Sequence, residues 1–320
     1  MSELLAVNAV EVTKRYGSLT AVNRITMQVD QGEVYGVLGP NGAGKTTFLR
    51  MLFGLIRPDE GTLEVFGRSW LSDGTRTLEG VAGFIESPKF YPYLSGLRNL
   101  QLLAALDGRG ADDRIADALE VVELTGREGD KVGDYSFGMR QRLGVAASLL
   151  RDPKLLVLDE PANGLDPAGI RDMRALVKRL AASGLTVLLS SHNMDEVEEI
   201  CDNVTIMRTG EVVYHGTITE LREQAPQQAH QVGTSDDTLA LAIATTVPGL
   251  EVVLVDGTLH ARGSQDLLDS WVSRIVGAGI ALRSLTLDET PLEALFFMLT
   301  ETSPSAVPLD LRSDQQGAHP

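Results

Sequence analysis

The sequence predicts an α/β fold with a mainly parallel, helix-covered sheet, followed by a smaller α+β domain. Three observations support this fold class. Helical patterns alternate with short apolar strands between residues 45 and 217. A glycine-rich segment, "GPNGAGKTT" (39–47), joins an apolar strand to a helix. After about residue 228 the elements follow a different order, β-α-β-β-α-β, which indicates a second domain.

The first elements are strands. Residues 3–38 alternate apolar and polar positions and are interrupted at Gly17 and Gly32, which predicts strands joined by turns. The apolar runs "KLLVLDE" (154–160) and "LTVLLSS" (185–191) predict buried parallel strands. Helical patterns occur at 45–57, 97–107, 112–125, 139–151, 168–183 and 193–201.

The composition of the sequence changes at the polar, proline-containing stretch "EQAPQQAH" (223–230). Strands at "HQVGT", "EVVLVDGTLHARG" and "IALRSLTL" then alternate with helices at 236–247 and 264–277, and the middle pair turns at Asp256-Gly257. This is the order of a ferredoxin-like domain, and a last helix is expected in "PLEALFFMLT". The predicted domains are therefore 4–222 and 228–301, with a disordered tail at 303–320.

Composition restricts the classes of partner. The formal net charge is −16, and residues 221–320 carry 5 basic and 13 acidic side chains. Because binding phosphates requires a basic patch, nucleic acid and anionic lipid are disfavoured as direct partners of the C-terminal part. The single cysteine, Cys201, lies in a helical pattern and is expected to be a buried structural thiol. No signal peptide or membrane span is recognised, so we expect any membrane role to depend on a partner.

The segment "GPNGAGKTT" matches the phosphate loop G-x-x-x-x-G-K-[ST] in both sequence and setting. Glycines let successive backbone N–H groups turn toward nucleotide phosphates, and the following helix N-terminus adds positive potential. Lys45 is placed to reach the outer phosphates, and Thr46 can bind Mg²⁺. The nucleotide-binding residues predicted in this segment are Gly39, Asn41, Gly42, Gly44, Lys45, Thr46 and Thr47.

A second phosphate-directed element is "LLVLDEP" (155–161), an apolar strand that ends in two acids. Asp159 is placed to hold Mg²⁺, and Glu160 to orient the attacking water or accept its proton. Two acids at the end of a strand are, by themselves, usually a solvated turn. Their occurrence behind a phosphate loop favours the catalytic interpretation.

The segment "DYSFGMRQRLGVAASLL" (134–150) resembles the signature segment of ABC ATPases. Ser136 and Gly138 match the family's Ser and second Gly, whereas Tyr135, Phe137 and Met139 depart from its pattern. The resemblance implies that the matching pair contacts a γ-phosphate bound on the opposite subunit. It also implies a P-loop fold with a RecA-like core, an antiparallel β subdomain and a helical subdomain.

Other landmarks of the family follow in the right order, and the resemblance covers roughly 4–222. Tyr16 matches the aromatic residue that stacks on adenine, Asp166 of "NGLDP" matches the D-loop, and His192 matches the switch histidine. A lone tyrosine or histidine is more often structural. In this context the resemblance implies a role for each in ATP binding or hydrolysis.

The segment "FIESPKFYPYLSG" (84–96) resembles the Q-loop, with Glu86 where most ABC ATPases have glutamine. A glutamate there would offer Mg²⁺ a hard, negatively charged ligand; the alternative is a surface glutamate in a loop. This pattern resembles the ATP-binding subunits of bacterial exporters for peptide antibiotics and related drugs. Phe90 and Tyr91 fit either core packing or a surface that reports nucleotide state to the membrane subunit.

The resemblance implies an ATPase that uses ATP and Mg²⁺ and powers export of a drug, antibiotic or lipid-like substrate. Expected partners are a separate transmembrane permease and a second ATPase subunit, as a homodimer, which places the chain at the cytoplasmic face of the membrane. One alternative is a soluble ABC ATPase acting on ribosomes or nucleic acid, which the acidic charge disfavours. Another is a nucleotide-binding scaffold without turnover, which the intact Lys45, Asp159, Glu160 and His192 disfavour.

Overall fold

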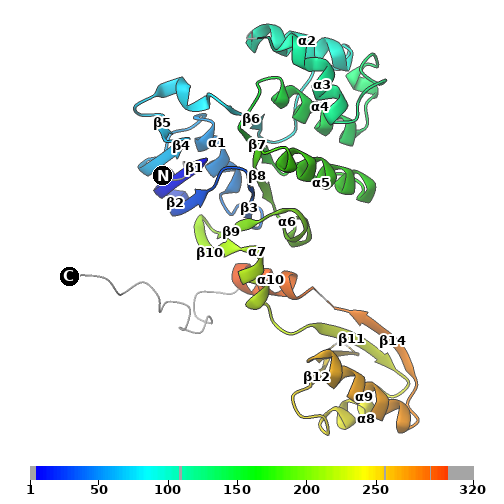
Figure 1. Cartoon of the computed structure of the whole chain (residues 1–320). Helices are drawn as coiled ribbons and strands as arrows, with labels where there is room; N and C mark the ends of the chain where they lie inside the picture. The colour runs from blue at the N-terminus through cyan, green and yellow to red at the C-terminus, as the bar shows by residue number, and fades with distance from the viewer. Residues whose placement is uncertain (1–4, 108–109, 256, 289, 302–320) are drawn as a thin grey trace, which may run out of the picture. The chain divides into compact units, whose positions relative to one another are not determined.

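In the computed structural model the chain forms two compact units, divided in sequence between Ile218 and Thr219 (Figure 1). The tail predicted at 303–320 and residue Asp256 of the predicted turn lie outside the described part of the chain. Among the described residues, no helix has the length and apolar character needed to span a membrane. The structure describes residues 5–107, 110–255, 257–288 and 290–301.

The first unit begins with an antiparallel sheet in the strand order β2-β1-β4-β5. β1 and β2 pair as a hairpin around Gly17, whose φ of +59° is a conformation that glycine adopts without strain. The strands predicted on either side of this glycine are confirmed. The bounds are Val7–Tyr16 (β1), Leu19–Val29 (β2), Glu60–Val65 (β4) and Arg68–Ser69 (β5).

A second sheet in the same unit has the order β10-β9-β3-β8-β7-β6. Its strands pair in parallel except for β10, which is antiparallel to β9. Every residue of β3, β7 and β8 is buried, as expected for strands that are covered on both faces. The bounds are Val34–Leu38 (β3), Val81–Phe84 (β6), Leu155–Asp159 (β7), Thr186–Ser191 (β8), Asn203–Arg208 (β9) and Glu211–Thr217 (β10).

Helices occupy the six predicted regions, but two are shorter than expected. The helix predicted at 45–57 ends at Leu52, because Gly54 turns to a φ of +64°. The helix predicted at 112–125 is α-helical only over Ile115–Val121, because Glu123 adopts a φ of +57°. The helices of this unit are Lys45–Leu52 (α1), Gly96–Asp107 (α2), Ile115–Val121 (α3), Phe137–Leu149 (α4), Pro167–Ala182 (α5) and Met194–Ile200 (α6). The next helix, Ile218–Glu223 (α7), starts at the last residue of this unit and continues into the second.

Helix α1 is the element that connects the two sheets. It contacts β2 and β4 of the first sheet and β7 of the second, and Phe48 and Leu49 are fully buried in the shared core. Replacing such a phenylalanine by alanine typically costs about 3–5 kcal/mol. The packing therefore holds the start of α1 rigidly at the carboxyl end of β3. Cys201 is buried, as predicted, and burial raises the pKa of its thiol.

The second unit has the predicted element order β-α-β-β-α-β. Its antiparallel sheet has the order β12-β13-β11-β14, which is the ferredoxin-like arrangement. Trp271 is fully buried between helices and sheet, and its indole N–H donates to the carbonyl of Ala240 at 3.0 Å. The bounds are Ala229–Thr234 (β11), Asp237–Ala244 (α8), Glu251–Val255 (β12), Thr258–Arg262 (β13), Gln265–Gly277 (α9), Leu282–Leu287 (β14) and Pro291–Glu301 (α10).

Candidate active site

The loop between β3 and α1 requires glycine for two different reasons. A Cβ atom on Gly39 would lie 2.4 Å from the carbonyl oxygen of Met207, so the loop passes too close to the backbone for a side chain. Gly44 combines a φ of +103° with a similar approach to the carbonyl of Ala21, at 2.3 Å. These constraints turn the loop so that the N-terminus of α1 opens into the site. That arrangement favours an anion.

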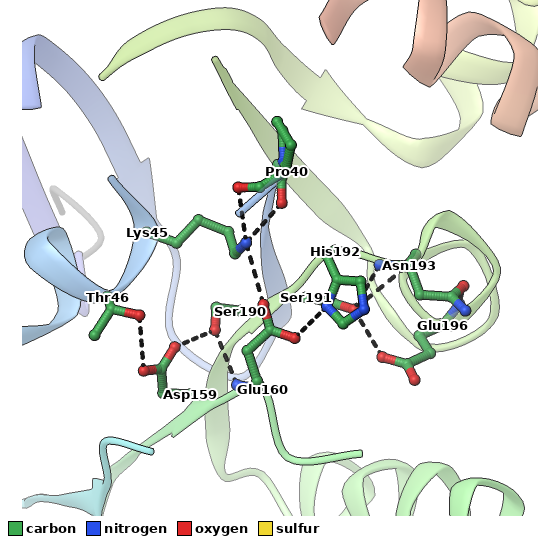
Figure 2. A network of polar contacts seen from close by, with 11 residues as sticks. Pro40, Lys45, Thr46, Asp159, Glu160, Ser190, Ser191, His192, Asn193 and Glu196 are labelled. Atoms are coloured by element: carbon green, nitrogen blue, oxygen red, sulfur yellow. Dashed lines mark hydrogen bonds and ion pairs between the residues drawn. The ribbon is translucent and has the colours of Figure 1, made fainter. Parts of the chain in front are cut away.

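Lys45 is buried at the first position of α1, with 5% of its surface exposed. Its ammonium group donates to the carbonyl of Gly39 at 2.6 Å and to that of Pro40 at 3.3 Å. The same group forms an ion pair with Glu160 at 3.1 Å (Figure 2). The only long basic side chain of the loop is therefore fixed directly over the site.

Asp159 lies at the end of β7 and is 3% exposed. The hydroxyl group of Thr46 donates to its Oδ2 at 3.0 Å, and that of Ser190 donates to its Oδ1 at 2.5 Å. Thr46 and Asp159 thus bring two hard oxygen ligands to one point at the mouth of the loop (Figure 2). A pair of this kind is what Mg²⁺ requires when phosphate and water supply its other ligands.

Glu160 follows directly and connects three elements. One carboxylate oxygen pairs with Lys45, and the other lies 2.5 Å from Nδ1 of His192 (Figure 2). The backbone of Glu160 has a φ of +50°, a left-handed conformation that costs a non-glycine residue energy. The structure thus joins the predicted catalytic pair, Glu160 and His192, with the predicted phosphate-binding lysine.

A cavity of about 730 Å³ opens at this point. Asn41, Gly42, Gly44 and Thr47 line it together with Lys45, Thr46 and the two acids. Tyr16 also lines the cavity and is 46% exposed. The cavity is large enough for a nucleotide. Residues that sequence reasoning did not assign to the site also line it: Leu19, Thr20, Ala21, Ala43, Ser87, Phe137, Gln141, Asn163, Gly164 and Thr209.

Gln141 and Phe137 belong to the segment 134–150 that resembles the family signature. Their position in that segment could have indicated that they lie at the site. Gln141 is 3% exposed, and its side-chain carbonyl has no hydrogen-bond partner among the residues that the structure describes. Phe137 departs from the family pattern, so its residue type gives no sign in the sequence of its presence at the cavity. The ring of Phe137 lies beside Gly164 of the predicted D-loop, since a Cβ atom added at Gly164 would lie 3.5 Å from it.

Glu86 lines the same cavity, and its side chain is 63% exposed. Its carboxylate forms an ion pair with Arg50 of α1 at 2.6 Å, and its backbone has a φ of +62°. Sequence reasoning did not foresee this pair. The contact links the predicted metal ligand to the helix that carries Lys45 and Thr46.

Three of the predicted ATP-binding residues are engaged locally instead. Ser136 caps α4 by accepting from the N–H of Met139 at 3.2 Å, and Asp166 caps α5 by accepting from the N–H of Gly169 at 2.8 Å. Gly138 packs near Leu165. These three residues are absent from the described lining of the cavity, as are Gly39 and His192.

A phosphate loop, a buried lysine and two adjacent acids at the end of a parallel strand define a nucleoside-triphosphate hydrolase of the P-loop class. Comparisons with known proteins define the class more narrowly. Residues 22–163 match the family model described as ABC transporter.

The chain is 36% identical to the bacitracin transport ATP-binding protein BcrA of Enterococcus faecalis, over 90% of this chain and 94% of that protein. It is 45% identical to the uncharacterized ABC transporter ATP-binding protein YdbJ of Bacillus subtilis, over 62% of this chain and 65% of that protein. Among solved structures it resembles cbiO1 of Clostridium perfringens, part of the transporter complex cbiONQ. That match has 26% identity and a TM-score of 0.64, and covers 69% of this chain and 92% of that one.

The chain therefore belongs to the family of ABC transporter ATP-binding proteins, and it is an ATPase of that family. The predicted family and fold class are confirmed. The residue roles inferred from the resemblance stay predictions.

Proposed function

We propose that this chain hydrolyses ATP with Mg²⁺ in sites shared by two copies, and that hydrolysis drives export through a separate transmembrane subunit. The observation that carries the proposal is the position of Glu160, which joins Lys45 to His192 at the mouth of the phosphate loop. In this arrangement one carboxylate lies beside both the predicted phosphate-binding cation and the predicted switch histidine.

Thr46 and Asp159 would hold the magnesium ion, because both present oxygen atoms at the same point. Bound there, Mg²⁺ would neutralise charge that develops on the transferred phosphoryl group. Glu86 is a candidate third ligand, since it lines the same cavity. Because one oxygen of this carboxylate pairs with Arg50, the ion and Arg50 would compete for it.

Other residues of this chain bind the nucleotide and act on the attacking water. Lys45 binds the outer phosphates, with the backbone N–H groups of the loop. Glu160 orients the attacking water or accepts its proton, and His192 holds Glu160 and senses the γ-phosphate. Tyr16, at the edge of the cavity, is placed to stack on the adenine.

Ser136, Gly138 and Asp166 serve the site of a second copy. Each lies outside the described lining of its own chain's cavity, and Ser136 caps the N-terminus of α4. A serine and a glycine at a helix N-terminus form a suitable contact for a γ-phosphate brought by another subunit. The proposed assembly is a homodimer with two composite sites.

The relationship to BcrA supports an antibiotic, a related drug or a lipid-like compound as the exported substrate. A surface for the transmembrane partner lies on the helical part of the ATPase unit. Tyr91 is 54% exposed and Leu106 is 86% exposed, and both line a cavity of about 620 Å³ with the partly buried Phe90. The exposure of Tyr91 favours the partner surface over core packing. Binding there would place the chain at the cytoplasmic face of the membrane.

The functional division of the chain remains part of this proposal. Residues 4–222 would hydrolyse ATP, and residues 228–301 would form an accessory domain. The nearly complete coverage of BcrA supports retention of both parts in a transporter ATPase.

The test uses the tagged full chain, purified from detergent-solubilised membranes of its source cells, with its companions identified by mass spectrometry. We expect a polytopic membrane protein to co-purify. Leu106→Asp should release it, whereas Leu71→Asp, at a residue 97% exposed in another part of the unit, should not.

A second arm measures resistance. Cells that lack the chain should become sensitive to a peptide antibiotic from a panel that includes bacitracin, and Glu160→Gln should fail to restore resistance. Recovery of the chain with ribosomes or nucleic acid, and not with a membrane protein, would overturn the export proposal.

A further inference from the structure

Ser190 is a fully buried serine near the end of a strand in which every residue is buried. It belongs to β8, whose sequence is "TVLLSS", and 0% of its surface is exposed. A hydroxyl group buried in this way destabilises a fold unless its hydrogen bonds are made. Sequence reasoning assigned Ser190 no role, and the established ATPase activity leaves its position unexplained.

The hydroxyl group of Ser190 makes two hydrogen bonds, and both go to the catalytic acids. It donates its single proton to Oδ1 of Asp159 at 2.5 Å. It also accepts from the backbone N–H of Glu160 at 2.9 Å. One atom therefore contacts the side chain of the predicted metal ligand and the backbone of the predicted general base (Figure 2).

The sheet fixes this contact. β7 and β8 are parallel neighbours, and their register places Asp159 opposite Ser190. The contact is made at the last position of β7, immediately before the chain turns into the left-handed conformation of Glu160. The bond from the Glu160 N–H thus anchors a strained backbone at the point where its direction determines the carboxylate's position.

The neighbouring serine has a different task. Ser191 donates to the carboxylate of Glu196 at 2.7 Å and accepts from the N–H of Asn193 at 3.0 Å. These contacts shape the segment that carries His192. The two serines therefore have different contacts. Of the two, only Ser190 bonds to Asp159 and Glu160.

We propose that Ser190 is a positioning residue for ATP hydrolysis, holding the Asp159 carboxylate through Oδ1 and the turn at Glu160 through its N–H. With Oδ1 held, Oδ2 of Asp159 remains directed at Thr46, where the metal ion is proposed to bind. With the Glu160 N–H held, the carboxylate of Glu160 remains between Lys45 and His192. This inference rests on the Mg²⁺-dependent hydrolysis proposed above.

The test compares Ser190→Thr with Ser190→Val in the full-length protein. These two side chains have nearly the same shape, and they differ in the presence of the hydroxyl group. Loss of a hydrogen bond to a charged group should lower kcat about 10- to 100-fold in the Val variant. The Thr variant should stay within about threefold of the wild type, and KM for ATP should change little in either.

Two further readouts separate positioning from a general loss of structure. The Mg²⁺ concentration that gives half of the metal-induced change in affinity for a fluorescent ATP analogue should rise about fivefold in Ser190→Val. This binding measurement requires no turnover. Thr186→Val is the matched control, since it removes another buried hydroxyl from β8, one that accepts from the N–H of Gly32 at 2.9 Å outside the site. The control should lower the melting temperature without changing the Mg²⁺ dependence.

Equal activity of the Thr and Val variants would overturn the proposal, because the hydroxyl group would then have no special part. Ser190→Ala covers the case in which the added methyl group of both variants disturbs folding. Wild-type kcat and Mg²⁺ dependence in Ser190→Ala would also overturn it. Failure of the proposed function would look different, since the wild-type protein itself would show no Mg²⁺-dependent hydrolysis.

Discussion

The residues predicted to touch ATP fall into two groups that the fold treats differently. Lys45, Thr46, Asp159, Glu160 and His192 contact one another, although they come from segments far apart in the sequence. Ser136 and Asp166 instead bond to backbone N–H groups three residues away and cap their own helices.

This difference shows which part of the site a single chain organises. The side chains of the first group contact one another within a single chain, at the start of α1 and just at or after the ends of β7 and β8. The second group is held at helix starts by cap bonds and does not belong to the described lining of the cavity. The proposed composite site of two copies would account for both arrangements.

The largest expected effect comes from breaking the first group at its centre. Glu160→Gln removes the charge that contacts Lys45 and His192 but preserves the shape of the side chain. Loss of general-base assistance should reduce steady-state ATP hydrolysis about 10²- to 10⁴-fold. ATP binding should be retained, and light scattering should detect an ATP-stabilised dimer.

The control for this variant is Glu120→Gln, at an exposed position of α3 remote from the cavity. It should hydrolyse ATP at the wild-type rate. Near-normal hydrolysis by Glu160→Gln would refute the role assigned to Glu160.

The second prediction tests the group that is held locally. Ser136→Ala should lower hydrolysis about 10- to 100-fold, because a γ-phosphate contact is lost. Affinity of the monomer for ATP should change less than about twofold, since the serine would serve the partner's nucleotide. Asp236→Ala is the matched control, because Asp236 caps α8 through a 3.0 Å bond from the N–H of Leu239. That variant loses a helix cap but should keep full activity.

Mixing two impaired proteins gives a further test of whether the groups act in different chains. Dimers that pair a Lys45→Ala chain with a Ser136→Ala chain contain one site with both groups intact. A 1:1 mixture should recover roughly one quarter of the wild-type rate if chains pair at random and the two sites act independently. Absence of any recovery, with dimers confirmed by light scattering, would argue that both groups act within one chain.

Much of the first group could be predicted from the sequence, because the residues after buried parallel strands must lie at one edge of the sheet. That rule brings Lys45 near Asp159 and Glu160 without knowledge of side-chain contacts. It does not identify which neighbours hold them. Ser190 is one of two adjacent serines, and only the register of β7 against β8 shows which one faces the acids.

The pair between Arg50 and Glu86 was unpredictable for a related reason. It joins a helix to a loop 36 residues away, and its geometry depends on a left-handed backbone at Glu86. Local propensity also failed at the two shortened helices. The apolar pattern continued past their ends, whereas positive φ values at Gly54 and Glu123 stopped them.

The third prediction concerns this ion pair. Glu86→Gln should raise the Mg²⁺ concentration needed for half-maximal hydrolysis about fivefold, the low end for a charged ligand, since the side chain is 63% exposed and already paired. Binding of ATP without metal should be unchanged or slightly stronger, because a negative charge near the phosphates is removed. A metal titration of the ATPase rate measures the first effect, and calorimetry the second.

Arg50→Met provides the complementary variant, since it frees Glu86 from its partner. The Mg²⁺ requirement should then fall by less than about fivefold, in line with a surface ion pair. If Glu86→Gln and Glu86→Ala both give the wild-type metal titration, Glu86 is a surface residue of the loop and not a ligand.

The smallest expected effect on catalysis extends the comparison to the second unit. Trp271 lies in the core cluster of that unit and donates to Ala240, and the described members of this cluster lie between residues 232 and 282. Trp271→Ala should destabilise this unit by about 3–5 kcal/mol, and calorimetry should show a lower transition for it. Because the ATPase unit has a separate core built around Phe48, ATP hydrolysis at a temperature below that transition should change less than about twofold.

Phe48→Ala is the contrasting variant, since the same kind of cavity under the phosphate loop should reduce hydrolysis together with stability. A large loss of hydrolysis in Trp271→Ala while the ATPase unit stays folded would show that the second unit supports catalysis, and dimer affinity measured by light scattering would then reveal whether it acts through subunit association.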